Sequence, residues 1–149
     1  MFREARAVWK GGLYAGEGVV TTPSGVLNNS TYAFDSLADT SRFTSPSEML
    51  AAAIASCVST MVAVEMAKVG IRPIVVETYV VLTLYSPTEG KYQISKVHLE
   101  ITARTTDPES SKFDEAVATA RRECPICSAL KVEMICKAKL VSVATPALV

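Results

Sequence analysis

Four cysteines, Cys57, Cys124, Cys127 and Cys136, are the residues of this 149-residue chain whose types and spacing could do redox or metal chemistry. A cysteine reacts and binds metals as its thiolate, and apolar burial raises the thiol pKa unless a cation or hydrogen bonds lower it. The sequence around each cysteine therefore indicates whether it is a nucleophile, a disulfide partner, a metal ligand or packing.

Cys57 lies in the apolar, alanine-rich stretch SPSEMLAAAIASCVSTMVAVEM, residues 45–66. Such a thiol is inert packing unless an arginine or lysine reaches it. Glu48, near the start of the same stretch, could orient a cation of this kind. It also completes the S-x-x-E pattern of a capping box with Ser45, so both roles for Glu48 stay open.

Cys124 is followed by Pro125, which disfavours α geometry at the residue before it. Cys124 is therefore expected at or near the N-cap of a short helix, where backbone N–H groups favour a thiolate. Arg121 and Arg122 could add positive potential. These features leave a redox role and a packing role for Cys124 equally open.

Cys124 and Cys127 form the C-x-x-C motif CPIC. A thioredoxin-like motif would follow a strand, whereas CPIC follows an expected helix, which argues against that function. A structural zinc site needs four ligands, and the single histidine, His98, lies in an alternating strand pattern, which argues against zinc. Cys136 is in phase with apolar neighbours on the last expected strand, and we interpret it as packing.

The pattern of apolar residues predicts the elements that position these cysteines. Residues 5–34 read as an antiparallel meander whose strand groups are ARAVW, GVVTT, GVLNN and TYAF, and residues 35–44 as a loop. Ser45 and Pro46 begin a long helix that runs to about Val69, with Gly70 as its C-cap.

The second half of the sequence predicts a hairpin, a helix and a final strand. The strands are residues 74–85 and 91–105, and a change of apolar phase near Ser95 and Lys96 predicts a β-bulge. A helix from about Asp107 carries an apolar stripe that ends at Cys124. We predict an α+β fold in a single domain, residues 1–149.

The amino-acid composition limits the kinds of binding partner to be expected. Acidic and basic residues number 15 each, so the sequence shows no basic excess that favours nucleic acid. The longest apolar run, residues 49–64, is shorter than the roughly 20 residues of a membrane span, so we expect a buried helix and no membrane partner. A hydrophobic content of 49% is high for a small soluble chain and predicts a partner subunit. The charged first ten residues, MFREARAVWK, do not resemble a signal peptide, so we expect a reducing compartment, the cytoplasm.

Three stretches, in order and spread over most of the chain, resemble the OsmC/Ohr family of osmotically inducible and organic hydroperoxide reductase proteins. They are AVWKGGLYAGEGVVTTPSGVLNNSTYAF, SPSEMLAAAIASC and ECPICSAL. The likeness is closer to the OsmC side of the family. It implies antiparallel strands wrapped around a long central helix, in an intertwined homodimer with active sites at the subunit interface.

The resemblance also implies a thiol peroxidase that needs no cofactor or metal. Cys57 would be the nucleophile and Cys124 the resolving cysteine, with an organic hydroperoxide as substrate and an external dithiol as reductant. The expected setting is oxidative-stress defence.

The sequence departs from the family pattern in three places. Leu37 occupies the position of the family's activating arginine, and Arg42 is the best substitute in the same loop. The acid of the helix start is Glu48, where closer relatives carry it one residue earlier. Cys127 replaces a serine, either as a second resolving thiol or, as we favour, as a conservative replacement. The missing arginine leaves a second hypothesis, a catalytically weak module that binds hydrophobic small molecules.

Overall fold

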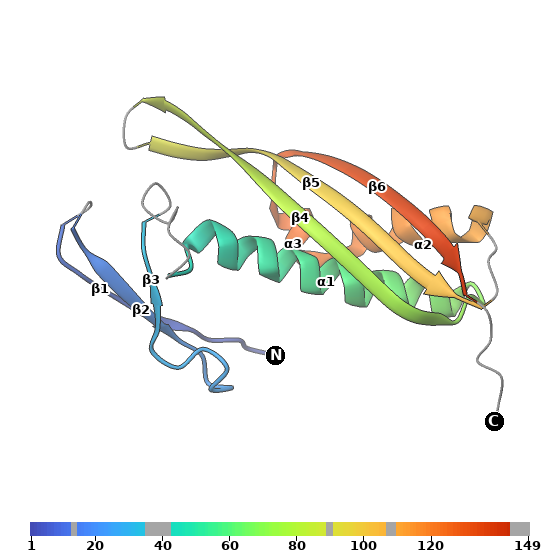
Figure 1. Ribbon diagram of the computed structural model, residues 1–149, viewed down its shortest axis with the longest axis horizontal. Coiled ribbons are helices and arrows are strands. Elements are labelled where there is room, and N and C mark those ends of the chain that lie inside the picture. Colours follow the sequence, from blue (N-terminus) through green and yellow to red (C-terminus); the bar gives the residue numbers. More distant parts are fainter. Residues whose placement is uncertain (13–14, 35–42, 89–90, 107–109, 144–149) are drawn as a thin grey trace. The chain divides into compact units, whose positions relative to one another are not determined.

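The computed structural model describes residues 1–12, 15–34, 43–88, 91–106 and 110–143. The chain divides into two compact units, residues 1–50 and 51–149. Figure 1 labels their helices and strands. The prediction that residues 1–149 make a single domain stays a prediction.

The first unit holds a three-stranded antiparallel sheet. Its strands are β1 (Arg6–Lys10), β2 (Glu17–Thr21) and β3 (Ser30–Tyr32), paired in that order. The predicted antiparallel meander is therefore confirmed. The aromatic ring of Tyr32 lies so close to Gly18 that a Cβ at position 18 would collide with it, so glycine is required there.

The group GVLNN, predicted as a strand, is instead part of a turn between β2 and β3. The backbone has a positive φ of 75° at Gly25 and 51° at Asn29, which a strand does not tolerate. The N–H of Thr22 donates to the carbonyl of Leu27 at 2.8 Å and closes the turn. Local hydrogen bonds of this turn thus override the β propensity of Val26 and its neighbours.

The long helix α1 (Pro46–Lys68) begins and ends as its sequence predicts. The hydroxyl of Ser45 accepts a hydrogen bond from the N–H of Glu48 at 3.1 Å, which satisfies one free donor of the first turn. At the other end Gly70 has φ 87°, and the N–H of Ile71 donates to the carbonyl of Met66 at 2.9 Å. This is the left-handed glycine cap expected from the sequence.

The second unit holds the strands β4 (Pro73–Thr88), β5 (Lys91–Thr105) and β6 (Glu133–Ser142). β4 and β5 pair antiparallel, and the register shifts because Thr83 faces Lys96 whereas Leu84 faces Ile94. Ser95 is the extra residue, and its hydroxyl donates to the carbonyl of Thr83 at 3.1 Å. The predicted bulge is confirmed.

β6 pairs with β5 in parallel, so this sheet is mixed and not purely antiparallel. The reason is the crossover formed by α2 (Ser110–Glu123) and α3 (Pro125–Ala129), which returns the chain to the end of the sheet where β5 begins. The predicted helix start near Asp107 lies outside the described residues, and α2 is described from Ser110.

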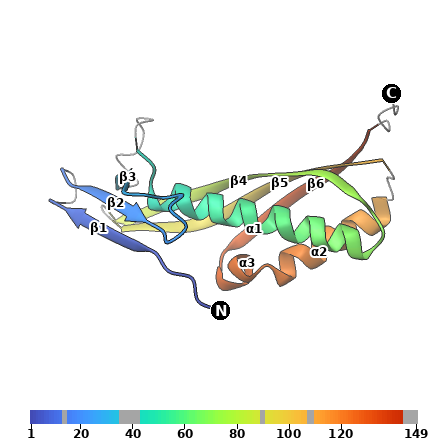
Figure 2. The ribbon, with the colours of Figure 1, turned by 90° about the horizontal axis from the view of Figure 1, so that it is seen from below.

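The core of the second unit lies between one face of the sheet and the helices. Figures 1 and 2 show α1 and α2 on the same face of the sheet. Buried side chains come from one stripe of α1, one face of β5 and one stripe of α2: Ile54, Val58, Val62, Met66, Val97, Leu99, Ile101, Ala103, Phe113, Val117 and Ala120. The predicted apolar stripe of α2 is therefore confirmed.

The prediction that the long helix is buried holds only for one side of α1 within a single chain. Five of its 23 residues are buried, and they lie on one stripe that continues to Glu65 and Met66. By length and composition alone α1 could also span a bilayer, a property that core helices of soluble proteins share. The other faces of α1 are apolar and are left open by the described residues of the same chain.

Candidate functional site

The second unit brings Cys57 and Cys124 together. Their sulfur atoms lie 3.0 Å apart, although the two residues are 67 positions apart in the sequence. Both are free thiols, because a disulfide bond is only about 2.05 Å long. The pair can exchange a proton or form a disulfide with little movement.

The helix break at Pro125 places Cys124. The N–H of Cys124 still donates to the carbonyl of Ala120 at 2.9 Å, as in the last turn of α2. The residue itself is extended, with φ −64° and ψ 116°, and acts as the N-cap of α3. Its sulfur accepts a hydrogen bond from the N–H of Cys127 at 3.4 Å. Cys124 is 0% exposed, so its sulfur faces the interior.

Cys57 lies at the edge of the buried stripe of α1, next to Val58. It is half-buried, so it is the more accessible sulfur of the pair. Two residues along, the hydroxyl of Ser59 donates to the hydroxyl of Thr78 on β4 at 2.8 Å. This bond fixes the rotation of α1 against the sheet and thereby the direction of Cys57.

The local hydrogen bonds favour the thiolate form of Cys124. Burial acts to raise the pKa of the Cys124 thiol. Hydrogen bonds to its sulfur act in the opposite direction and outweigh burial, so the pKa is lowered. Their donors are the Cys57 thiol, the N–H and thiol of Cys127, and the N–H of Ile126. Either sulfur of the pair can hold the shared proton. The N–H of Cys127 favours the charge on Cys124, because it donates to that sulfur alone, whereas the N–H of Ile126 acts on both sulfurs.

The other thiols hold their protons more tightly. Burial, the hydrogen bond to Cys124 and the negative charge of Cys124 raise the pKa of Cys57. The N–H of Ile126 acts in the opposite direction. Burial and the neighbouring Cys124 raise the pKa of Cys127 to about 12. Burial also raises the pKa of Cys136, against the attraction of Arg121. Cys57 therefore needs a base, a further cation or both before it can react.

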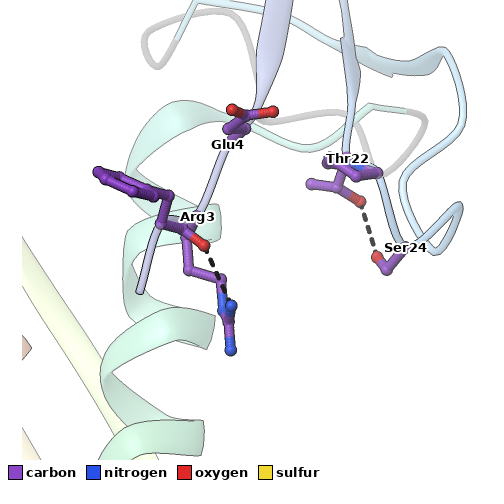
Figure 3. Close-up of a pocket in the computed structure, with 6 residues that line it drawn as sticks. Arg3, Glu4, Thr22 and Ser24 are labelled. Atoms are coloured by element: carbon purple, nitrogen blue, oxygen red, sulfur yellow. Dashed lines mark hydrogen bonds between the residues drawn. The ribbon is translucent and has the colours of Figure 1, made fainter.

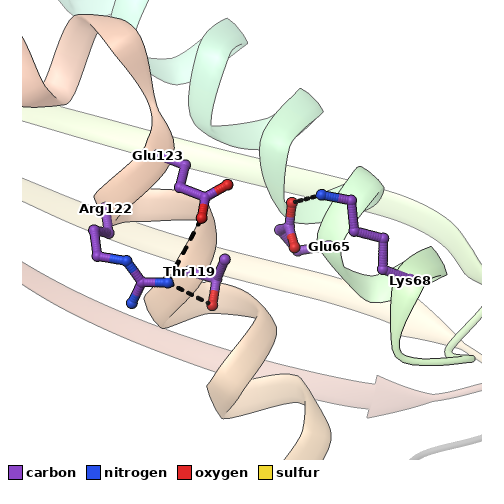
Figure 4. A network of polar contacts seen from close by, with 5 residues as sticks. All are labelled: Glu65, Lys68, Thr119, Arg122 and Glu123. Atoms are coloured by element: carbon purple, nitrogen blue, oxygen red, sulfur yellow. Dashed lines mark hydrogen bonds and ion pairs between the residues drawn. The ribbon is translucent and has the colours of Figure 1, made fainter.

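Arg121 and Arg122, expected to add positive potential at Cys124, make hydrogen bonds and ion pairs with other groups. Figure 4 shows Arg122 turned toward Thr119 and Glu123, at 3.3 Å and 3.7 Å. Arg121 donates to the carbonyl of Met134 on β6 at 3.2 Å. Its positive charge lowers the pKa of Cys127 and of Cys136.

Figure 4 also shows the buried carboxylate of Glu65, which pairs with Lys68 at 2.7 Å one turn further along α1. Glu65 is 5% exposed, so the pairing offsets the cost of burying its charge. This pair stabilises the end of α1 and contains no thiol.

Glu48 has a local partner. Its Oε2 accepts a hydrogen bond from the hydroxyl of Thr44 at 2.6 Å, while its N–H is held by Ser45. Its place at the helix start is therefore established, and its action on a cation stays a prediction. Arg42 and Leu37 lie outside the described residues, so the role of Arg42 also stays a prediction.

The metal hypothesis gains no support. Among the described residues, no group of three or more histidine, cysteine, aspartate or glutamate side chains is arranged to hold a metal ion. The third cysteine near the pair, Cys127, is engaged with Cys124 as a hydrogen-bond donor.

A separate hollow of about 660 Å³ lies in the first unit, next to Thr22 and Ser24 of the turn after β2. Figure 3 shows Arg3 donating to the carbonyl of Phe2, and the hydroxyls of Thr22 and Ser24 bonded to each other. Its six lining residues include no cysteine, so it offers no thiol chemistry.

The class of protein follows from comparison with known sequences. The profile of the family described as OsmC-like protein matches residues 39–138. The chain is 30% identical over 132 residues to a protein named Peroxiredoxin OsmC from Escherichia coli (strain K12), covering 89% of this chain and 92% of that protein. The same figures apply to Peroxiredoxin OsmC from Shigella flexneri. This chain belongs to the OsmC-like family.

Solved structures share the fold. An OsmC-like protein of unknown function from Vibrio cholerae matches with a TM-score of 0.76 at 17% identity, over 93% of this chain and 99% of that one. The organic hydroperoxide resistance protein OhrB of Bacillus subtilis matches with a TM-score of 0.64 at 22% identity, over 93% and 98%. The expected α+β OsmC-like fold is therefore confirmed.

Sequence reasoning missed the backbone of Ile126. Its N–H lowers the pKa of both Cys57 and Cys124, so it favours a thiolate on either sulfur. The signal was available in part, because Pro125 predicts a new helix start whose first N–H groups lack partners within the helix. The direction of these groups toward Cys57 depends on tertiary packing.

The lowered pKa of Cys124 gives a titration that can be measured. As pH rises, the ultraviolet absorbance of a thiolate should appear in wild type at a lower pH than for an ordinary cysteine. Cys124→Ser should remove this early step, whereas Cys136→Ser, at the half-buried thiol of β6, should retain it. The anion would lie on Cys57 if Cys57→Ser removed the step and Cys124→Ser did not.

Proposed function

We propose that this protein is a thiol-dependent peroxidase that reduces organic hydroperoxides in oxidative-stress defence. The observation that carries the proposal is the 3.0 Å contact between the accessible thiol of Cys57 and the buried sulfur of Cys124. The names of its relatives support the class of reaction, since one is a peroxiredoxin and another an organic hydroperoxide resistance protein.

Cys57 is the nucleophile because it is the sulfur that a substrate can reach. The anionic Cys124 takes the proton of Cys57 through their hydrogen bond. The Cys57 thiolate then attacks the distal oxygen of the hydroperoxide, the O–O bond breaks, and Cys57 becomes a sulfenic acid. The departing alkoxide takes the proton back from Cys124 and leaves as the alcohol.

Cys124 is thereby a thiolate again, next to the sulfenic acid. It attacks the sulfur of Cys57, the S–O bond breaks, and the hydroxide takes a proton from solvent and leaves as water. The product is a Cys57–Cys124 disulfide, which an external dithiol reduces by exchange. The apolar composition of α1 around Cys57 favours substrates with hydrocarbon tails.

Consumption of cumene hydroperoxide with dithiothreitol as reductant tests this function. Cys57→Ser should reduce the rate to that of the reaction without protein, because no other described thiol combines access with a proton acceptor. Cys124→Ser should still form one sulfenic acid per Cys57, which dimedone traps for mass spectrometry. Cys136→Ser is the matched control and should keep the wild-type rate. Equal rates in Cys57→Ser and wild type would contradict the proposal.

Arg42 and Glu48 are proposed to assist Cys57. A guanidinium close to Cys57 would stabilise the thiolate as it forms, and Glu48 would orient that guanidinium. Arg42→Ala should then slow hydroperoxide consumption about tenfold for each unit by which the pKa of Cys57 rises. Arg104→Ala, at an exposed residue of β5, serves as the control.

Glu48→Gln separates orientation of a cation from helix capping. Glutamine can also close a capping box, so the free energy of unfolding should change little. The negative charge is lost, so the rate should fall with that of Arg42→Ala. A wild-type rate in Glu48→Gln would assign Glu48 to the helix cap alone.

The apolar surface of the chain supports a homodimer, which we include in the proposal. α1 is apolar on all sides but buried on one, and β4 exposes large apolar side chains: Ile74, Val75, Tyr79, Val81 and Tyr85. Exposed apolar area of this extent is typical of a subunit interface. Sedimentation equilibrium should give twice the chain mass at micromolar concentration, and Tyr79→Lys should lower the dimer affinity. A monomer at all concentrations would contradict this part of the proposal.

A further inference from the structure

Cys127 is a third thiol in contact with the pair, and the proposed function leaves it unused. It is 5% exposed and lies in the first turn of α3. Its N–H donates to the sulfur of Cys124 at 3.4 Å, and its thiol donates to the same sulfur. The sulfur of Cys124 thus contacts two other cysteines, Cys57 on α1 at 3.0 Å and Cys127 on α3.

The covalent geometry suits a bond between Cys124 and Cys127. Residues three apart at a helix start have Cβ atoms about 5–6 Å apart, and a disulfide needs about 3.5–4.5 Å. Because Cys124 is an extended N-cap and not a helical residue, rotation about its backbone can close this gap without disturbing α2. Cys124 therefore has two possible disulfide partners.

Electrostatics keep Cys127 inactive until the pair is oxidised. Burial, the hydrogen bond to Cys124, and negative charge on Cys124 or on Cys57 raise its pKa to about 12, and only the charge of Arg121 opposes them. A Cys57–Cys124 disulfide carries no charge, so the charge effects of both sulfurs disappear and the hydrogen bond to an anionic acceptor is lost. Burial then competes with Arg121 alone, and Cys127 becomes easier to deprotonate.

We propose, on the basis of the proposed function, that Cys127 is a third redox residue that takes over the disulfide from Cys57. The sulfur of Cys127 attacks the sulfur of Cys124 in the Cys57–Cys124 disulfide. The Cys124–Cys127 bond forms as the Cys57–Cys124 bond breaks, and the proton of Cys127 passes to the departing Cys57 sulfur. The exchange consumes no oxidant or reductant.

The consequence is a separation of tasks among the three sulfurs. Cys57, the most accessible of them, returns to the thiol form that meets the substrate. The disulfide is held within the CPIC turn until an external dithiol reduces it. Serine in place of Cys127 would leave the disulfide on Cys57.

Disulfide mapping on the wild-type protein tests this exchange. Trypsin places Cys57 in the peptide of residues 43–68 and both Cys124 and Cys127 in that of residues 123–131. The protein is oxidised with stoichiometric cumene hydroperoxide, quenched in acid, alkylated with N-ethylmaleimide and digested. We expect an unlabelled, internally bonded 123–131 peptide and a singly labelled 43–68 peptide. A cross-linked pair of peptides in wild type would overturn the inference.

Two variants test the route. In Cys127→Ser the same treatment should give the cross-linked peptides and lose the label on Cys57. In Cys57→Ser hydroperoxide should leave Cys124 and Cys127 reduced, because oxidation enters at Cys57. An internally bonded peptide formed equally fast in Cys57→Ser would overturn the exchange. Cys136→Ser is the control, since Cys136 lies in a separate peptide and should be labelled throughout.

A second oxidant distinguishes failure of this inference from failure of the proposed function. Diamide oxidises dithiols without peroxidase chemistry. If hydroperoxide has no effect but diamide gives the internally bonded peptide in wild type, the pairing of Cys124 with Cys127 is supported and the peroxidase function is contradicted. If both oxidants give only the cross-linked peptides, the peroxidase function is supported and the role of Cys127 is contradicted.

Discussion

The 3.0 Å contact between the sulfurs of Cys57 and Cys124 is the interaction on which the proposed chemistry of this chain depends. Two thiols in an apolar interior cannot both ionise, because burial penalises each charge and like charges at this distance repel. At most one of them is therefore a thiolate, and the other then holds the proton between the two sulfurs. The peptide N–H groups of Ile126 and Cys127 supply the stabilisation that a polar solvent would otherwise give to the anion.

The fold serves mainly to make this contact reproducible. Cys57 is fixed by a helix whose buried stripe includes Ile54 and Val58 and whose rotation is set by the bond from Ser59 to Thr78. Cys124 is fixed by the end of α2, which Arg121 ties to β6. Cys57 lies within α1, and Cys124 lies between the end of α2 and the start of α3, so packed helices position both sulfurs.

Local sequence patterns predicted most of the fold because the forces behind them are local. The cap at Ser45, the glycine at Gly70 and the bulge at Ser95 each depend on a few neighbouring residues. Two features of the fold depend on contacts that a short sequence pattern does not contain. Val26 has a high β propensity but lies in a turn closed by Thr22 and its neighbours. The parallel pairing of β6 results from the path of a whole crossover, which no short pattern records.

The cysteines of the candidate site could be predicted from the sequence, but the groups that stabilise a thiolate there could not. A resemblance to a family pointed to Cys57 and Cys124, whereas their own surroundings in the sequence left packing as an equal alternative. The sequence suggested a cation for Cys57 and positive potential from Arg122 for Cys124. The structure instead turns Arg122 toward Glu123 and uses neutral N–H donors for Cys124. Such donors are invisible in a sequence, because every residue except proline carries one.

In the proposed mechanism, a single negative charge in this buried cluster also imposes an order on the chemistry. While Cys124 holds the charge, it suppresses ionisation of Cys127 on one side and accepts the proton of Cys57 on the other. The proposed first oxidation therefore begins at Cys57, since its proton has an acceptor and its sulfur is accessible. Once Cys124 is bonded, its charge is gone and Cys127 is released from that suppression. In this proposal the sulfur of Cys124 activates Cys57 and restrains Cys127. When Cys124 enters a disulfide with Cys57, its restraint on Cys127 is removed.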